Sequence, residues 1–87
     1  MHLAERNEGE FRVYAAAIEA EGGVGFYAGV VVKPWGSRSL CGRGEVFRDE
    51  RLEDGMTWES AEEALEFALR VGAAAVRAQR AFAAHVA

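Results

Sequence analysis

A long helical pattern in the C-terminal part of the chain constrains the fold more than any other feature. Ser60 stands at its start and Glu63 follows three positions later. A serine in this place accepts a hydrogen bond from the amide of the third residue, and a glutamate there can return one to the serine amide. Small apolar residues then recur every three or four positions, opposite a stripe of Glu and Arg. We therefore predict a helix over about 61–84.

The apolar side of this helix is made of small residues. Ala64, Ala68 and Gly72 recur at intervals of four, so they share one face. Glycine in a helix interior costs about 1 kcal/mol relative to alanine. The pattern predicts that this strip lies close against a sheet or a second helix.

Two strand patterns precede the helix. Apolar residues alternate over about 11–20 and again over about 25–33, and Gly22-Gly23 lies between the two runs. This arrangement predicts a β-hairpin. Pro34 cannot donate a hydrogen bond to a neighbouring strand, so the second arm should end near Lys33.

The remaining segments have weaker patterns. Residues 45–52 hold few large apolar residues but predict a third strand. Residues 1–10 show neither a helical nor a strand period and are expected to form a flexible lead. We predict an α+β domain over 11–87, an antiparallel sheet of three or four strands with one long C-terminal helix packed on a face.

Size and charge limit the classes of function. The chain has 87 residues, of which 51% are hydrophobic, enough for one modest core. The net charge of -4 disfavours a dedicated nucleic-acid binder. No apolar run approaches the length of a membrane span, and we expect a cytoplasmic protein with no membrane association. The abundance of Ala and Arg indicates a GC-rich bacterial genome.

Residues that carry chemistry do not cluster in the sequence. His2, Cys41 and His85 are far apart and show no metal-ligand spacing, so we predict no metal, no cofactor and no catalytic residue. The single cysteine excludes an intrachain disulfide. Gly22-Gly23-Val24-Gly25 leads into a strand, whereas phosphate loops lead into a helix. We expect a protein that is not an enzyme.

The segment from Lys33 to Arg51 is the main candidate for partner binding, because basic residues alternate there with aromatic ones. The candidate residues are Trp35, Arg38, Arg43 and Phe47. Exposed tryptophan is common at protein-binding hot spots, which favours an unidentified protein partner. The alternative is a single-stranded nucleic acid, whose bases stack on aromatic side chains and whose phosphates bind cations.

The predicted helix is longer than the predicted sheet. About 24 helical residues span roughly 36 Å, whereas a strand of about 8 residues spans roughly 27 Å. The helix end should therefore extend past the sheet and expose apolar residues to a second copy of the chain. We predict a homodimer with Gly72, Ala75, Phe82 and Val86 as the self-association residues.

Two stretches resemble a known family. The strand pair and Gly-rich turn of Tyr14 to Ala28, and the helix start of Thr57 to Ala68, are similar to the small β-β-β-α domain of HicB-like antitoxins. The resemblance implies the fold predicted above and carries over no functional residue. We expect a small protein-interaction module, a regulatory or accessory protein of a mobile element, with single-stranded nucleic-acid binding as the alternative.

Overall fold

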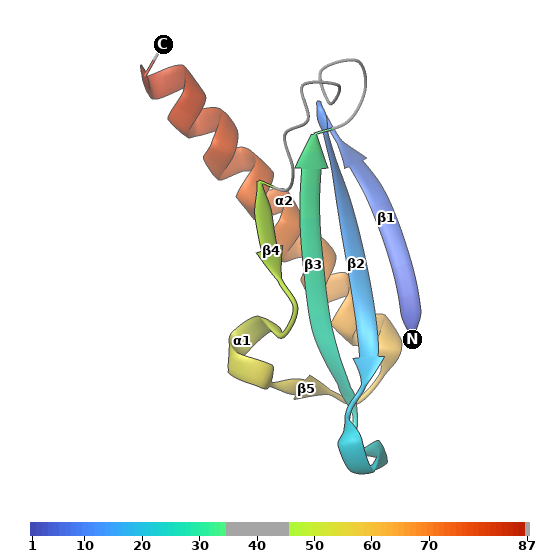
Figure 1. Cartoon of the computed structure of the whole chain (residues 1–87). Helices are drawn as coiled ribbons and strands as arrows, with labels where there is room; N and C mark the ends of the chain where they lie inside the picture. Colours follow the sequence, from blue (N-terminus) through green and yellow to red (C-terminus); the bar gives the residue numbers. More distant parts are fainter. Residues whose placement is uncertain (35–45, 87) are drawn as a thin grey trace.

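The computed structural model describes residues 1–34 and 46–86, the last five of these by their backbone only. The strands of the sheet come first along the chain, and one long helix follows them (Figure 1). The elements are β1 (His2–Glu8), β2 (Phe11–Glu19), the 3-10 turn η1 (Glu21–Gly23), β3 (Phe26–Pro34), β4 (Phe47–Asp49), α1 (Leu52–Gly55), β5 (Thr57–Trp58) and α2 (Ala61–Val86). The predicted α+β class, with a long C-terminal helix on an antiparallel sheet, is confirmed.

The sheet is an antiparallel meander in the order β1-β2-β3-β4, and β5 pairs with β3 beside β4. The predicted hairpin is present: β2 pairs with β3 from Phe11 opposite Pro34 to Glu19 opposite Phe26. Its turn needs glycine, because Gly22, Gly23 and Gly25 all have positive φ. The strand β3 is therefore the centre of the fold and has neighbours on both edges.

The prediction of a flexible lead over residues 1–10 is wrong. His2–Glu8 forms β1 and pairs with β2 along its whole length, from His2 opposite Ala17 to Glu8 opposite Phe11. Gly9, with φ of 62°, belongs to the tight turn that joins the two strands. The strand has no apolar alternation because it lies at the edge, where most of its side chains are exposed. Backbone pairing along the whole strand places it in the sheet, and Ala4 is its one apolar residue that packs against the core.

The third predicted strand, 45–52, is shorter than expected. β4 covers only Phe47–Asp49, which pair with Val32 to Val30 of β3. The chain then turns through α1, in which Glu53 and Asp54 both have left-handed backbone angles. This turn buries Leu52, which is 4% exposed, and the chain rejoins β3 as β5.

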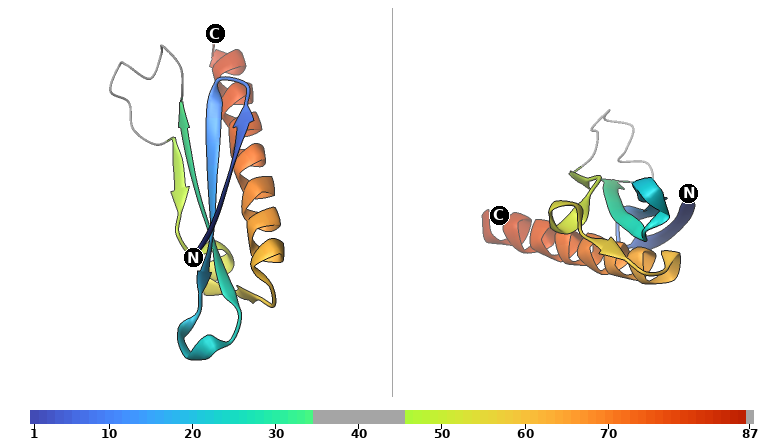
Figure 2. Two further views of the ribbon diagram at one scale, coloured as in Figure 1. Left: turned by 90° about the vertical axis from the view of Figure 1, so that its right-hand side faces the viewer. Right: turned by 90° about the horizontal axis from the view of Figure 1, so that it is seen from below.

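The helix α2 begins where the sequence predicts. The Glu63 amide donates to Ser60 Oγ at 3.1 Å, and the Ala64 amide donates to the Ser60 carbonyl oxygen at 3.2 Å. Figure 2 shows α2 crossing one face of the sheet, with its C-terminal end projecting past the sheet in the view from below. The side chains from Arg77 to Ala81 are exposed, and among them the Arg80 guanidinium lies against Gly9 in the β1–β2 turn, so the helix is still beside the sheet there.

The core lies between α2 and one face of β2 and β3. Its largest fully buried side chains are Val13, Val30, Val32 and Val76. Full burial of one such side chain contributes about 1.5–3 kcal/mol. Ala64 and Ala68 are completely buried, and a methyl group at Gly72 would overlap Val13, so the small strip of α2 lies close to the sheet as predicted. Among the described residues no helix has the length and apolarity that a membrane crossing requires.

Candidate functional site

The two faces of the sheet differ in what covers them. The side chains of Val13, Ala15 and Ala17 point toward α2 and are buried. Their neighbours in β2 point the opposite way. Figure 2 shows α2 on one side of the sheet only. We call the other side the outer face.

The outer face is apolar in its centre. Leu3 is 73% exposed and Tyr14 is 37% exposed, so large apolar groups are in contact with solvent there. Strand alternation and pairing place six residues on this face: Leu3, Tyr14, Ala16, Ile18, Tyr27 and Val31. Monomeric proteins seldom expose a contiguous apolar surface unless it has a function.

A hollow of about 360 Å³ lies in the middle of the outer face. Its floor contains the facing pair Ala16 and Gly29, which have almost no side chain between them. The Glu50 carbonyl oxygen lies 3.1 Å from the position that a Cβ of residue 29 would occupy. Glycine at 29 thus lets the chain after β4 pass close to β3. Tyr14 and Ile18 bound the hollow along β2.

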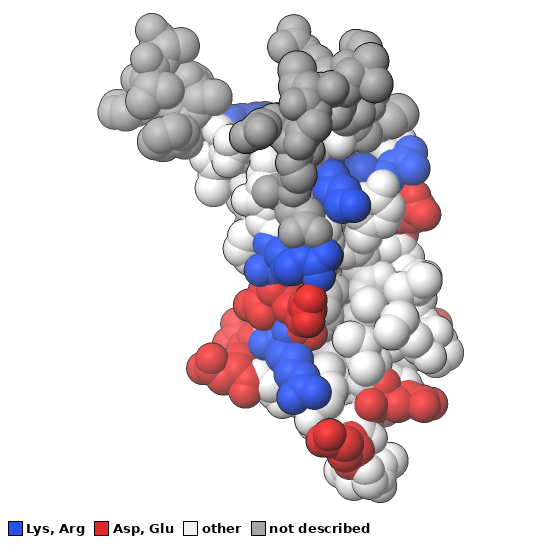
Figure 3. Space-filling model, viewed as in Figure 1, with Lys and Arg blue, Asp and Glu red and all other residues white. Residues whose placement is uncertain are grey.

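Charged residues border the apolar surface. Arg12 donates to Glu5 at 3.0 Å and to Asn7 at 2.9 Å. On the opposite side, Arg48 donates to Glu50 at 2.6 Å. Figure 3 shows the uncharged area of this face with charged side chains around it. These exposed ion pairs add little stability, but they define the limits of the apolar surface.

Two cations lie over the tyrosines of this face. The Arg51 guanidinium carbon is 4.4 Å from the centre of the Tyr27 ring, and Lys33 Nζ is 5.9 Å from the centre of the Tyr14 ring. Both separations permit a cation–π attraction. Of the two rings, that of Tyr14 lines the hollow, whereas Tyr27 is not among its lining residues.

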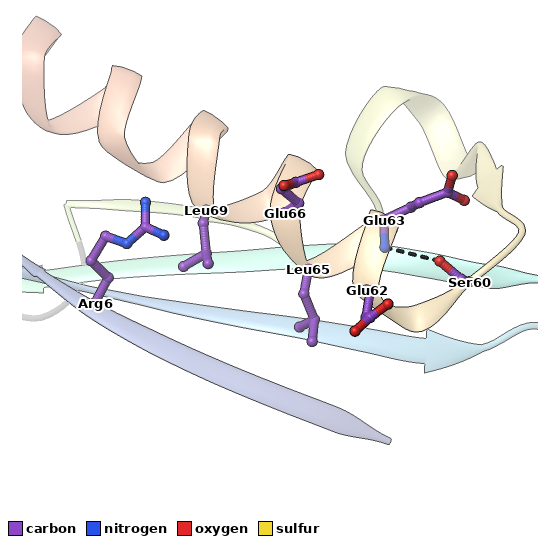
Figure 4. A pocket seen from close by; sticks show the side chains of 7 residues that line it. All are labelled: Arg6, Ser60, Glu62, Glu63, Leu65, Glu66 and Leu69. Carbon is purple, nitrogen blue, oxygen red and sulfur yellow. Dashed lines mark hydrogen bonds between the residues drawn. The ribbon is translucent and has the colours of Figure 1, made fainter.

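A second hollow, of about 650 Å³, lies between β1 and the first turns of α2. Arg6, Ser60, Leu65 and Leu69 line it together with the glutamates at 62, 63 and 66. In Figure 4 the three carboxylates point in different directions, and Ser60 is engaged with the Glu63 amide. The arrangement is that of an exposed acidic helix start rather than of converging reactive groups.

Outside these two hollows, the described residues do not bring together polar side chains of the kinds that catalysis or metal binding requires. Within residues 1–34 and 46–81 no polar or charged side chain is buried. No group of three His, Cys, Asp or Glu side chains in this part of the chain is placed to hold a metal ion. His2 packs edge-on against Phe26, with ring centres 5.7 Å apart.

Of the four predicted partner-binding residues, the structure describes only Phe47. Trp35, Arg38 and Arg43 lie outside the described residues. Phe47, the first residue of β4, is half-buried and packs against the core, so only part of its ring is available to a partner.

Two of the four predicted self-association residues have side-chain surroundings that the structure describes, and two do not. Gly72 is buried against Val13, and Ala75 is half-buried against the core, so both serve packing within the chain. The prediction that Gly72 faces a second copy is therefore wrong. The side chains of Phe82 and Val86 lie outside the described residues.

The outer face was not among the predicted sites, although the sequence holds a signal for it. In 11–20 and 25–33 the residues on both sides of each strand are largely apolar. A single helix can cover only one face of a sheet. An apolar second face is therefore implied by the strand patterns and the helix count together.

Comparison with models of protein families, with curated proteins and with solved structures gave no match. The resemblance to HicB-like antitoxins therefore stays a prediction.

Proposed function

We propose that the chain is a non-enzymatic protein-interaction module and that the outer face of the sheet is its docking surface. One observation carries the proposal: an apolar hollow, bordered by ion pairs, on a face that α2 does not cover. Removing such a surface from water yields about 25 cal/mol per Å². The outer face thus supplies a driving force for association that the exposed acidic hollow at α2 lacks.

The chemistry of the face favours a protein over a nucleic acid. Leu3, Ile18 and Val31 are aliphatic, and aliphatic side chains provide no stacking platform for bases. Arg12 and Arg48 are each paired with a carboxylate, which offsets their attraction for phosphate. Protein interfaces, by contrast, combine an apolar centre with a polar border.

Single-stranded nucleic acid is the second candidate, because Tyr14 and Tyr27 share the outer face and each has a cation near its ring. Tyrosine rings with neighbouring cations are the usual elements of single-strand binding. This candidate predicts binding that weakens steeply with salt, whereas apolar docking does not.

Site-specific photocrosslinking in the cells that naturally make the protein tests the proposal. A photoreactive phenylalanine analogue is placed at position 14, on the outer face. The control carries it at position 74, where Ala74 is exposed on α2. We expect discrete protein adducts from position 14 and none from position 74.

Two results would contradict the proposed function. One is adduct formation that is equal at the two positions or absent from both. The other is an adduct from position 14 that nuclease converts back to the mass of the single chain, which would favour the nucleic-acid alternative.

A further inference from the structure

The outer face is organised in levels along the strands. Cross-strand partners lie side by side and point the same way. The pairing places Glu5, Tyr14, Val31 and Arg48 at one level. The next level holds Leu3, Ala16 and Gly29, and Glu50 lies against Gly29. The first level is a ridge of large side chains, and the second is the floor of the hollow.

These two levels are complementary to each other. A two-fold axis that crosses the strands at the height of Ala15 exchanges position 14 with position 16 along β2. Two outer faces related by this axis pack with β2 antiparallel to β2. Tyr14 of each copy then lies over Ala16 of the other, beside the Glu50 main chain that covers Gly29, so each ridge enters the opposite hollow.

The charges at the border match under the same axis. Arg48 belongs to the ridge level and Glu50 lies at the hollow level. The axis therefore sets Arg48 of one copy opposite Glu50 of the other, twice. The same exchange brings Leu3 opposite Glu5. Opposite charges in facing positions fix the register of two surfaces.

The size of the face also suits such a contact. The strands β1 to β4 have 7, 9, 9 and 3 residues, and at about 3.4 Å per residue and about 4.8 Å between strands they give a face of about 450 Å² per copy, or about 900 Å² for two copies. Specific interfaces begin near this size, and contacts at this end of the range are weak. Aligned packing of two sheets is a standard way to close an apolar face.

We infer that the outer face binds a second copy of this chain, with Tyr14 in the opposite hollow and Arg48 facing Glu50. The inference rests on the proposed function and names its partner. In this inference the outer face, and not α2, is the surface of association, since Gly72 and Ala75 pack within the chain.

The first measurement is the mass of the purified protein by light scattering at about 100 μM, where an interface with a micromolar Kd is filled. We expect the mass of two chains, unchanged in Arg77→Glu and Phe82→Ser on α2. A single-chain mass would overturn the inference, as would dissociation caused by Phe82→Ser.

Charge reversal tests the register. Arg48→Glu and Glu50→Arg each place like charges opposite one another, and each should raise the dimer Kd at least about tenfold. An equal mixture of the two variants restores both opposite pairs between chains and should recover a dimer. The pair within each chain stays broken, so recovery cannot come from repaired folding. A mixture that associates no better than its components would overturn the inference.

A matched pair at Leu3 gives a second test that does not depend on folding, because this side chain is 73% exposed. Leu3→Glu should weaken the dimer through Glu5 of the other copy, whereas Leu3→Lys should retain it. Equal masses for the two variants would contradict the stated arrangement.

The failure of this inference can be told from that of the proposed function. A single-chain mass combined with a position-14 adduct to a different protein leaves the proposed function standing and removes only the second copy. A single-chain mass with no adduct removes both.

Discussion

Gly72 of α2 lies so close to Val13 of β2 that a methyl group at position 72 would overlap Val13 Cγ1 and lie 3.1 Å from Cγ2. Val13 is fully buried, and its branched side chain has little rotamer freedom with which to move aside. The absent side chain thus sets the distance between helix and sheet.

Gly72→Ala should therefore lower the free energy of unfolding by about 1 kcal/mol, because overpacking costs more than the gain in helix propensity. Urea unfolding of the variant and the natural protein measures this change in free energy. Ala74→Gly, at an exposed site of the same helix, gives the propensity effect alone, a loss of about 1 kcal/mol. A Gly72→Ala variant more stable than the natural protein would show that the contact between Gly72 and Val13 does not set the distance between helix and sheet.

The left-handed turn before β5 predicts a stabilising substitution. Glu53 has φ of 55° and ψ of 43°, a conformation that costs a non-glycine residue about 1–2 kcal/mol. Glu53→Gly should raise the free energy of unfolding by about 0.5–1 kcal/mol after the entropy cost of glycine. Gly55→Ala, at φ of 87° with open space around its Cβ, should lower it. Thermal melts should show a higher Tm for Glu53→Gly, and a lower Tm for Gly55→Ala, than for the natural protein.

The two glycines of the β2–β3 turn should differ in their tolerance of alanine. Gly23 has φ of 71° and open space, so Gly23→Ala bears only the backbone cost of about 1 kcal/mol. At Gly25 the added Cβ would also lie 2.7 Å from the Trp58 carbonyl oxygen of β5. Gly25→Ala should lose at least about 1 kcal/mol more than Gly23→Ala in the same unfolding assay. Equal losses would show that β5 moves aside freely.

The start of α2 depends on one side chain. Ser60→Ala removes the acceptor of the Glu63 amide and should cost about 1 kcal/mol. Ser60→Asp keeps an acceptor and adds a favourable charge at the helix N-terminus, so its stability should match that of the natural protein. Circular dichroism during urea unfolding compares them, and an unchanged Ser60→Ala would mean that packing alone fixes the helix start.

The parts of the fold that the sequence predicts are those where side-chain pattern and burial agree. Ser60 and Glu63 mark the start of α2 directly, and Gly22-Gly23 marks the turn of the hairpin. The sequence pattern does not predict β1. An edge strand can be held by backbone hydrogen bonds to one neighbouring strand, so exposed polar residues such as Glu5 and Arg6 are tolerated in it.

The candidate site is less predictable. Tyr14 and Gly29 are far apart in the chain, and only the pairing of β2 with β3 shows that a ridge lies beside a hollow. Their register depends on the turn at Gly22-Gly23. No local pattern around either residue carries that information.

The polar character of β1 has a further consequence. Within the described part of the chain this strand pairs on one side only, and its other edge presents free backbone groups to solvent. An apolar edge of this kind would invite strands of other chains and lead to open-ended fibres. The side chains of Glu5, Arg6 and Glu8 place charge along it instead. Growth of the sheet through its edge is thereby discouraged, and an assembly built on its face closes at a finite size.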